Sequence, residues 1–484
     1  MNPALLTHEW LVLGLGLAVL LADLWLPATA RRNLGHAAAA GVGAILLYSL
    51  LAVHVPAGTA AYAFGDVYVL DGLALFFKRL FLATGLLVLI MSVEFSDRLG
   101  GAISEFYALI LFALAGMMFA SSANDFSLLF VSIELITVTF YILTSYQRSR
   151  AASLEAGVKY LTMGALSTGV MVFGIALVSG VSGKMNFTEL AAVAGACAAK
   201  PLFLFGAVLV FAGLAFKIAA FPFQIWTPDV YQGAPTPVTA FLAVGSKAAG
   251  IVLLLRVLFV ALPPVAENWR NLLVIISGIT ILYGNLCAIP QRNVKRLMGY
   301  SSIAQAGYLL LGVAALNAQG QSAVLYYLGG YLCAVLAVFT VISLVSRETG
   351  GEDVSILSGL HQRSPLLAAA LTLSMVSLAG IPPLAGFFGK FLLFRSLIAS
   401  APGHPGTYCL VFTALIGVVI SLYYYGGIIR AVYWSRETPD QTPIQPSLPI
   451  QASLYGCVLG MLVLGLFPAP MLAVVKQAAL LLKP

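Results

Sequence analysis

Long continuous apolar runs divide the chain and restrict the folds open to it. A helix needs roughly 20 residues to cross about 30 Å of hydrocarbon. Because the apolar residues do not alternate with polar ones, the runs predict helices and exclude a membrane β-barrel. We therefore expect an all-α polytopic membrane protein of about 14 transmembrane helices, near 5–26, 35–54, 70–92, 105–121, 124–146, 155–180, 202–231, 236–259, 269–289, 300–316, 322–346, 365–399, 405–434 and 449–470.

The composition leaves no room for a separate soluble catalytic domain. Only 9% of the 484 residues are charged and 61% are hydrophobic, whereas soluble proteins carry roughly 25% charged residues. The five cysteines stand singly, with no CxxC pair, so neither a metal site nor an iron–sulfur cluster is expected. No phosphate-binding motif occurs, and no cofactor is expected in this chain. The net charge of +7 is attributed to loops at the membrane surface and not to nucleic-acid binding.

The distribution of Lys and Arg among the loops predicts the orientation. One set of loops carries Arg31, Arg32, Arg98, Arg148, Arg150, Arg292, Lys295, Arg296, Arg347, Arg363, Arg430 and Arg436, and the other carries Lys184, Lys200, Arg270, Lys476 and Lys483. By the positive-inside rule, the first set faces the cytoplasm. Both termini are then predicted to lie on the outer side.

Two of the apolar runs contain proline near the middle. Pro222 interrupts 202–231, and Pro382 with Pro383 interrupts 365–399. Proline removes a backbone donor and clashes with the preceding turn, so both runs are predicted to be broken helices. A simple kink is the alternative for a single proline.

The two predicted breaks lie five segments apart, and this odd spacing reverses the direction of crossing. Inverted repeats require such a reversal, and their discontinuous helices mark ion or substrate sites. We expect two inverted five-helix repeats, at 105–259 and 260–434, each with a broken helix. Helices in 1–104 precede them, and a final helix and tail in 435–484 follow.

Four ionisable residues fall inside the predicted helices. They are Glu134, Lys217, Lys247 and Lys390. Each costs about 2.5–3.5 kcal/mol at mid-bilayer and is a functional hypothesis by default. Glu134 could simply neutralise Lys217 and lock two helices together, but Lys247 and Lys390 have no obvious acidic partner. Because burial lets a lysine exchange its proton near neutral pH, these residues favour a proton relay over static pairing.

Other polar residues carry weaker signals. Lys159 follows Glu155 by four residues and favours a helical ion pair, and Lys295 reads mainly as positive-inside charge, although it could admit protons. Asp229 could cap the broken helix, and Tyr300, with nearby serines, could hold water or bond neighbouring helices. Arg256 and Arg395 are expected to extend to the membrane surface. The surroundings of Lys78 and Arg79 stay open at this point.

Several motifs resemble those of the antiporter-like, proton-translocating membrane subunits of respiratory complex I. The first is FKIAAFPFQIWTPDVYQGAPTPVTAFL at 216–242, followed by Ser246 and Lys247. The resemblance extends to 133–135, 293–303, 378–383 and 389–391, and it spans nearly the whole chain. It implies the same fold of two inverted repeats.

The resemblance also implies roles for the buried charges. Glu134 and Lys217 match the family's charged pair, Lys247 its connecting lysine and Lys390 its exit-side group. A histidine and a glutamate common in the family are here Gln224 and Gln232, which weakens any cytoplasmic entry path drawn by analogy.

By the same resemblance, the chain is a proton-translocating, non-redox subunit in a bacterial inner membrane. The positive-inside rule then places both termini in the periplasm. NADH, FMN, iron–sulfur clusters and quinone belong to other subunits, and its partners are other membrane subunits, lipid, water and protons. A subunit of a multisubunit sodium/proton antiporter is the main alternative. A purely structural membrane scaffold is the third.

Overall fold

The computed structural model describes residues 3–27, 30–402, 405–434 and 442–479. Within them, 13 helices are long and apolar enough to cross a membrane. The helices are α1 (Thr7–Asp23), α2 (Arg31–Leu51), α3 (Gly72–Phe95), α4 (Ile103–Ser121), α5 (Phe126–Thr144), α6 (Ala151–Ser182), α7 (Phe187–Cys197), α8 (Pro201–Ile218), α9 (Trp226–Gly233), α10 (Thr236–Phe241), α11 (Lys247–Arg256), α12 (Ala266–Ala288), α13 (Val294–Ala314), α14 (Ala318–Thr349), α15 (Leu360–Arg363), α16 (Pro365–Ala379), α17 (Ala385–Ser400), α18 (Pro405–Trp434), α19 (Leu448–Leu466) and α20 (Ala469–Ala479).

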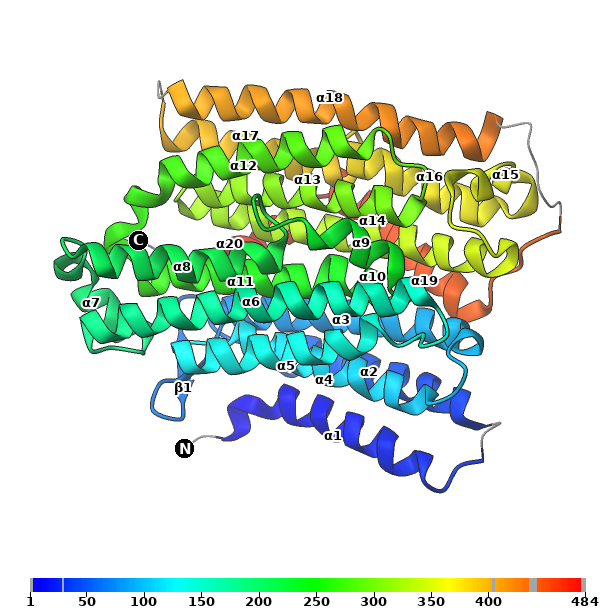
Figure 1. Cartoon of the computed structure of the whole chain (residues 1–484), viewed down its shortest axis with the longest axis horizontal. Coiled ribbons are helices and arrows are strands. Elements are labelled where there is room, and N and C mark those ends of the chain that lie inside the picture. The colour runs from blue at the N-terminus through cyan, green and yellow to red at the C-terminus, as the bar shows by residue number, and fades with distance from the viewer. Residues whose placement is uncertain (1–2, 28–29, 403–404, 435–441, 480–484) are drawn as a thin grey trace.

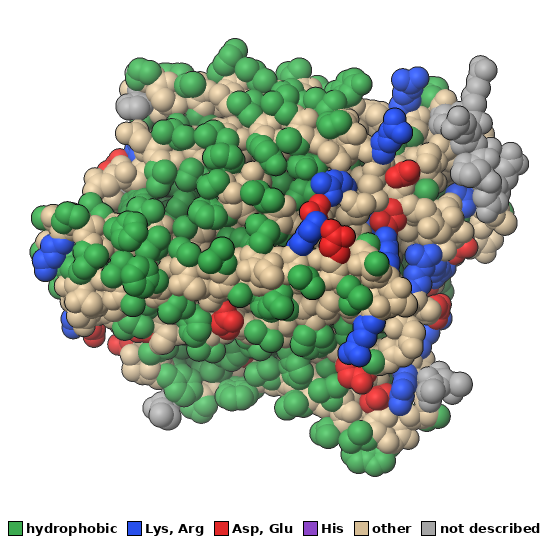
Figure 2. Space-filling view, in the orientation of Figure 1, with side chains coloured by type: hydrophobic (Ala, Val, Ile, Leu, Met, Phe, Trp, Pro, Cys, Tyr) green, Lys and Arg blue, Asp and Glu red, His purple; other side chains and the backbone are tan. Residues whose placement is uncertain are grey.

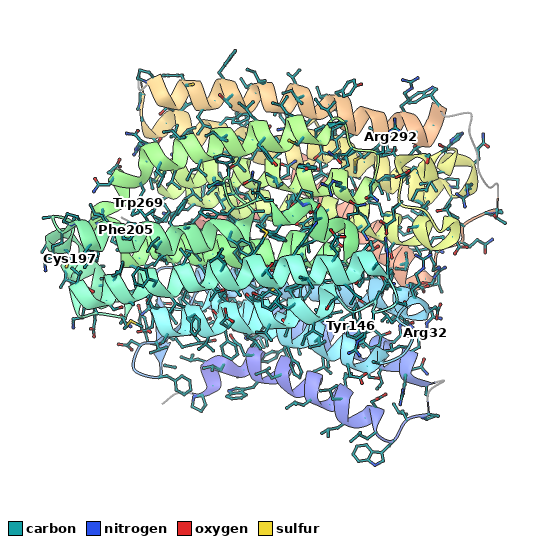
Figure 3. The ribbon with its side chains drawn as sticks, in the orientation of Figure 1. Arg32, Tyr146, Cys197, Phe205, Trp269 and Arg292 are labelled. Carbon is teal, nitrogen blue, oxygen red and sulfur yellow. The ribbon has the colours of Figure 1, made fainter. Side chains whose placement is uncertain are left out.

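The long helices run side by side along one axis (Figure 1). Arg32, Tyr146 and Arg292 lie at one end of the bundle, whereas Cys197, Phe205 and Trp269 lie towards the other (Figure 3). Lys and Arg gather at the end that carries Arg292, and hydrophobic side chains cover much of the visible flank (Figure 2). We refer to these as the basic end and the opposite end. Arg436 and Lys483 lie outside the described residues.

Both predicted helix breaks are present. The first separates α8 from α9 after Ala219, which adopts φ +62°, and the second separates α16 from α17 after Gly380, with φ +86°. Left-handed residues of this kind end helices, and the prolines that follow prevent immediate continuation. The pair α16–α17 supplies a crossing in two pieces, in addition to the 13 uninterrupted spans. The kink alternative is therefore wrong at both positions.

Three elements were not expected from the sequence. A two-stranded antiparallel hairpin pairs β1 (Ala60–Ala63) with β2 (Tyr68–Asp71) ahead of α3. Two short helices were also not expected: α7 lies between the predicted spans 155–180 and 202–231, and α20 follows the last predicted span. The expected all-α membrane fold is confirmed, and the one small hairpin added to it is too short to leave a hydropathy signal.

The centre of the bundle is formed by fully buried helices. The segment Thr236–Ala261 comprises α10, the π-helical turn Leu242–Ser246, α11 and the π-helical turn Val257–Ala261, and its apolar window is entirely buried. The apolar window of α13 is equally buried. Wider turns of this type are frequent at functional sites in helices. The irregular backbone therefore lies inside protein, where neighbouring groups can satisfy it.

Arg256 does not extend to the membrane surface as expected. Its guanidinium is buried and bonds both carboxylate oxygens of Asp71, at 2.9 and 3.1 Å. Its Nε donates to the carbonyl oxygen of Ser121 at 2.7 Å. Asp71 also accepts from the backbone N–H of Ala74 and so begins α3. The expectation failed because Asp71 lies far away in sequence and reads as an ordinary loop residue.

Lys78 has a buried carboxylate partner that the sequence did not reveal. Its Nζ lies 2.7 Å from Glu9 Oε1 and 2.5 Å from the hydroxyl oxygen of Tyr68. Arg79 instead donates to the carbonyl oxygens of Ser49 and Val53. Glu9 stands near the start of α1, where an acidic residue is usually solvated, but folding places it against α3.

We expect Asp71→Asn to destabilise the protein by about 3–5 kcal/mol, because Asn retains the helix cap but leaves the Arg256 charge buried and unpaired. The double variant Asp71→Asn with Arg256→Met should recover much of this loss. The thermal unfolding midpoint in detergent measures both effects. Equal midpoints for Asp71→Asn and the unaltered protein would contradict the assignment.

Candidate functional site

Lys217 is buried near the C-terminal end of α8 and binds a hydroxyl group. Its Nζ donates to Thr137 Oγ1 of α5 at 2.6 Å and lies 3.5 Å from the hydroxyl oxygen of Tyr160. The Thr137 hydroxyl in turn donates to the carbonyl oxygen of Ile133 at 2.5 Å. Because its own proton is engaged by this carbonyl, Thr137 offers a lone pair to the amine. The amine is held without a carboxylate in contact.

A small cavity of about 10 Å³ adjoins this contact. Its polar lining comes from Lys217, Thr137, Ser167 and Thr168. A polar cavity of about this size can hold one water molecule with several partners. A water-sized space therefore lies beside the amine.

Glu134 does not contact Lys217. Among the described residues no ion pair within 4.0 Å and no hydrogen bond joins the two side chains. Glu134 is half-buried, and its Oε1 has no hydrogen-bond partner. The alternative in which Glu134 simply neutralises Lys217 as a fixed clamp is not the arrangement seen.

Lys247 begins α11 directly after the π-helical turn and binds Ser302 of α13. Its Nζ donates to both the carbonyl oxygen and Oγ of Ser302. Ser302 Oγ also shares hydrogen bonds of 3.1 Å with the hydroxyl groups of Tyr231 and Tyr331. Ser302 is therefore the centre of a buried hydroxyl cluster that surrounds the amine.

Lys390 binds the second helix break itself. Its Nζ donates to the carbonyl oxygens of Leu378 and Ala379 at 2.8 and 3.2 Å. These carbonyls lie at the end of α16, where the interrupted helix provides no intrahelical donors. The Tyr308 ring lies 4.5 Å from Nζ and adds a cation–π contact. The break thus supplies the oxygens that a buried amine needs.

A second polar group, centred on Gln305, adjoins the surroundings of Lys390. Gln305, one turn beyond Ser302 on α13, donates through Nε2 to the Leu378 carbonyl at 3.4 Å and to the Tyr425 hydroxyl at 3.2 Å. Its Oε1 accepts from Tyr327. Lys390 and Gln305 therefore share one acceptor. Among the described residues no hydrogen bond joins this group to the Ser302 cluster, but the rings of Tyr327 and Tyr331 stack with their centroids 6.4 Å apart and bring the two groups together.

Asp229 joins the two halves of the chain at the basic end. It lies 2.6 Å from Lys159 of α6 and also contacts Arg296 of α13. Lys159 keeps the predicted pair with Glu155 at 2.6 Å. Asp229 occupies the first turn of α9 but makes no capping hydrogen bond. Its suggested role as a simple cap is therefore wrong.

Lys295 is buried and belongs to a second ionic group at the same end. Its Nζ lies 2.8 Å from the Ala234 carbonyl oxygen and 3.2 Å from Glu352, and Arg150 lies 2.7 Å from the same carboxylate. Burial by itself would raise the pKa of Glu352, but Lys295, Arg150 and nearby donors lower it below its ordinary value. Lys295 is therefore a buried member of this ionic group and not a solvated residue of the membrane surface.

The remaining predicted positions lie around this end of the site. Tyr300 is only half-buried. The guanidinium carbon of Arg296 lies 5.9 Å from the centroid of the Tyr300 ring. Gln232 accepts from Arg296 at 3.2 Å. Gln224 is buried, and its Oε1 has no partner among the described residues. Pro222, Pro382 and Pro383 all lie in the two breaks, as expected.

Sequence reasoning missed the groups that hold the lysines. Thr137, Tyr160, Tyr327, Tyr331 and Tyr425 supply hydroxyl groups from helices far apart along the chain. Their residue types are common in membrane helices, so only their convergence is informative. The serines that follow Tyr300, Ser301 and Ser302, were expected to hold water or bond neighbouring helices, and both are buried in the network.

Glu352→Gln is expected to lower stability at pH 7 by about 1–3 kcal/mol, because bonds to charged groups are lost. The folded pKa lies below the unfolded value of about 4.3, so this stabilisation is present above pH 4.3 and disappears as pH falls through the folded pKa. Unfolding midpoints of both proteins measured from pH 7 to pH 3 should therefore converge in acid.

Glu348→Gln is the matched control, because Glu348 is exposed and, among the described residues, pairs only with the preceding residue, Arg347. Its effect should stay below about 1 kcal/mol. A difference between Glu352→Gln and the unaltered protein that persists unchanged at pH 3 would contradict the assignment.

Comparison with known proteins identifies relatives over the full length. Residues 123–421 match the family model described as NADH:quinone oxidoreductase/Mrp antiporter, TM. The NADH-quinone oxidoreductase subunit N of Moorella thermoacetica is 38% identical over 97% of this chain and 97% of that protein. A chain of respiratory complex I from Thermus thermophilus is 34% identical, with a TM-score of 0.80, and covers 96% of this chain and 98% of that chain.

A chain of the Mrp complex from Dietzia shares the fold. It superposes with a TM-score of 0.83 at 22% identity, covering 98% of this chain and 97% of that chain. Similarity at this level of identity concerns the fold alone.

Proposed function

This chain belongs to the NADH:quinone oxidoreductase/Mrp antiporter family, alongside relatives named subunit N of NADH-quinone oxidoreductase, and on that premise we propose that it translocates protons as a membrane subunit of respiratory complex I. Its relay consists of Glu134, Lys217, Lys247 and Lys390. Lys159, Lys295, Asp229 and Tyr300 line the approach from the basic end. The chain performs no electron transfer itself.

One observation supports this proposal most directly: Lys217, Lys247 and Lys390 are buried and are held by neutral oxygens. An amine paired with a carboxylate cannot lose its proton without leaving a buried negative charge behind. An amine held by hydroxyl and carbonyl oxygens carries no such penalty. These lysines are therefore suited to bind and release protons.

The Glu134–Lys217 separation supplies the control step. When Glu134 approaches Lys217, it stabilises the protonated amine; when it withdraws, as in the arrangement described, Lys217 retains only Thr137 and Tyr160 and passes its proton on. Transfer proceeds towards Lys247 and then, along Ser302 and Gln305, towards Lys390. Moving one charge across the membrane involves about 2.3 kcal/mol per 100 mV, comparable to a change of roughly two pKa units at about 1.36 kcal/mol each.

The driving chemistry belongs to neighbouring subunits. NADH, FMN, iron–sulfur clusters and quinone react elsewhere in the complex, and the contribution of this chain is to respond to charge movement next to Glu134. The enzyme activity is that of the assembly, a proton-translocating NADH:quinone oxidoreductase. Other membrane subunits, lipid and water are the immediate partners.

The two inverted repeats, 105–259 and 260–434, each contribute one broken helix to the relay. The segments 1–104 and 435–484 flank them. The basic end faces the cytoplasm of a bacterial inner membrane, so both termini lie in the periplasm.

Lys217→Met and Lys247→Met should each abolish most proton transfer through this chain, because losing a proton-transfer group costs about a hundredfold or more in rate. NADH-driven acidification of inverted membrane vesicles measures this effect. Native electrophoresis with an NADH dehydrogenase stain checks that the complex is assembled.

Lys184→Met is the matched control, because Lys184 is a partly exposed lysine that pairs with the exposed Glu189. Pumping should be unchanged in this variant. Undiminished pumping in both relay variants would exclude the relay assignment. Migration of the chain in a smaller, unstained assembly with sodium-dependent transport would favour the sodium/proton antiporter.

Orientation is tested with reporters fused to the C-terminus. Alkaline phosphatase folds only outside the cytoplasm, so its fusion should be active, whereas a fused green fluorescent protein should stay dark when exported unfolded. A fusion inserted next to Arg148, at the basic end, should show the opposite behaviour. Active phosphatase next to Arg148 would overturn the orientation.

A further inference from the structure

A cavity of about 610 Å³ lies at the basic end, outside the relay. It is bounded by the end of α12, the residues around Asp353 and the last turns of α18, which packs beside α12. Arg292, one of its lining residues, lies in the half of the bundle nearer the basic end (Figure 3). The cavity therefore lies where the headgroup layer meets the ends of the helices.

One wall of this cavity is held rigidly by backbone hydrogen bonds. Val354 N–H donates to the Arg292 carbonyl oxygen, and Val294 N–H donates to the Glu352 carbonyl oxygen, both at 2.8 Å. These bonds place Arg292 and Asp353 on one fixed loop surface. Backbone hydrogen bonds therefore fix the position of this wall of the cavity.

The opposite wall is opened by two glycines of α18. A Cβ atom added to Gly426 or Gly427 would meet no atom within 4 Å. Beyond them, Tyr423 and Val419 are 72% and 66% exposed. An apolar surface along α18 therefore leads out of the cavity towards the hydrocarbon layer.

The charges in this cavity differ from the others at the basic end. Arg98, Arg150 and Arg296 are each engaged by carbonyl oxygens or carboxylates. By contrast, the exposed guanidinium groups of Arg292 and Arg430 have no hydrogen-bond or ion-pair partner among the described residues, and neither does the Asp353 carboxylate. Two cations and one anion thus line a single cavity without pairing.

We propose that this cavity binds the headgroup of a phosphatidylethanolamine molecule. The phosphate lies between Arg292 and Arg430, which match phosphate oxygens through charge-assisted hydrogen bonds. The ammonium group faces Asp353. The acyl chains follow the exposed apolar face of α18 past Val419, and Ile289 and Ile428 pack against the glycerol region.

The set of charges favours this occupant over others. An acidic side chain of a neighbouring subunit, or a lipid with a purely anionic headgroup, would satisfy the arginines but bring negative charge towards Asp353. Basic pockets between helices on the cytoplasmic side commonly bind lipid headgroups. The additional carboxylate selects a headgroup that carries both charges.

The test uses the assembled complex in lipid nanodiscs that contain phosphatidylethanolamine with a photoreactive diazirine near its headgroup. After irradiation, labelling of peptides covering 286–297 and 419–434 is quantified by mass spectrometry. Arg292→Gln and Arg430→Gln should each lower this labelling about tenfold, the usual effect of losing a hydrogen bond between charged groups. Arg148→Gln should not, because Arg148 is equally exposed at the same end but lines a different cavity.

A second arm replaces the probe by photoreactive phosphatidylglycerol, which lacks the amine. Asp353→Asn should lower labelling by the ethanolamine probe severalfold and leave the glycerol probe unchanged or stronger. Equal labelling by both probes, insensitive to Asp353→Asn, would overturn the proposal. So would labelling that survives loss of both arginines, or density for a neighbouring subunit's side chain between them in a map of the complex. Because neither Arg292 nor Arg430 belongs to the proposed relay, the labelling outcomes are read independently of the pumping assay.

Discussion

A lysine amine inside the hydrocarbon layer must be surrounded by oxygen atoms, and the identity of those oxygens determines what the lysine can do. A carboxylate stabilises the protonated amine but locks it in that state. Lys217, Lys247 and Lys390 instead bind Thr137, Ser302 and the carbonyls of α16. The central part of the molecule is arranged around this choice of neutral acceptors.

Backbone carbonyls are most available as acceptors where helical hydrogen bonding is interrupted, because carbonyls within a regular helix already accept a bond from their own helix. The irregular segments of the fold accordingly lie next to the buried amines. Lys217 precedes the left-handed Ala219, Lys247 follows the π-helical turn Leu242–Ser246, and Lys390 reaches back to the break after Gly380. Burial within the bundle protects these segments from lipid. Each of these buried lysines therefore lies next to a segment in which the regular helix is interrupted or widened.

Carboxylate-paired cations occupy the two ends of the bundle. Asp71–Arg256 and Glu9–Lys78 lie near the opposite end, while Asp229 and Glu352 organise ionic groups at the basic end. Breaking such a pair leaves an uncompensated buried charge, so these groups hold helices together. The amines suited to proton exchange lie between them, apart from fixed counter-charges. The carboxylate-paired groups and the lysines held by neutral oxygens therefore occupy different levels along the axis of the bundle.

The amino-acid sequence by itself determined the apolar helices, the two breaks and the buried positions of Lys217, Lys247 and Lys390, because each depends on local hydropathy or on proline chemistry. Only the tertiary structure decided which groups meet. Arg256 reads as an ordinary residue near a helix end, yet it is buried against Asp71, 185 residues away in sequence. Thr137 is an ordinary helical hydroxyl in the sequence, and only the fold brings it into contact with Lys217 of α8. Such partnerships arise from packing between distant segments, which hydropathy and spacing do not encode.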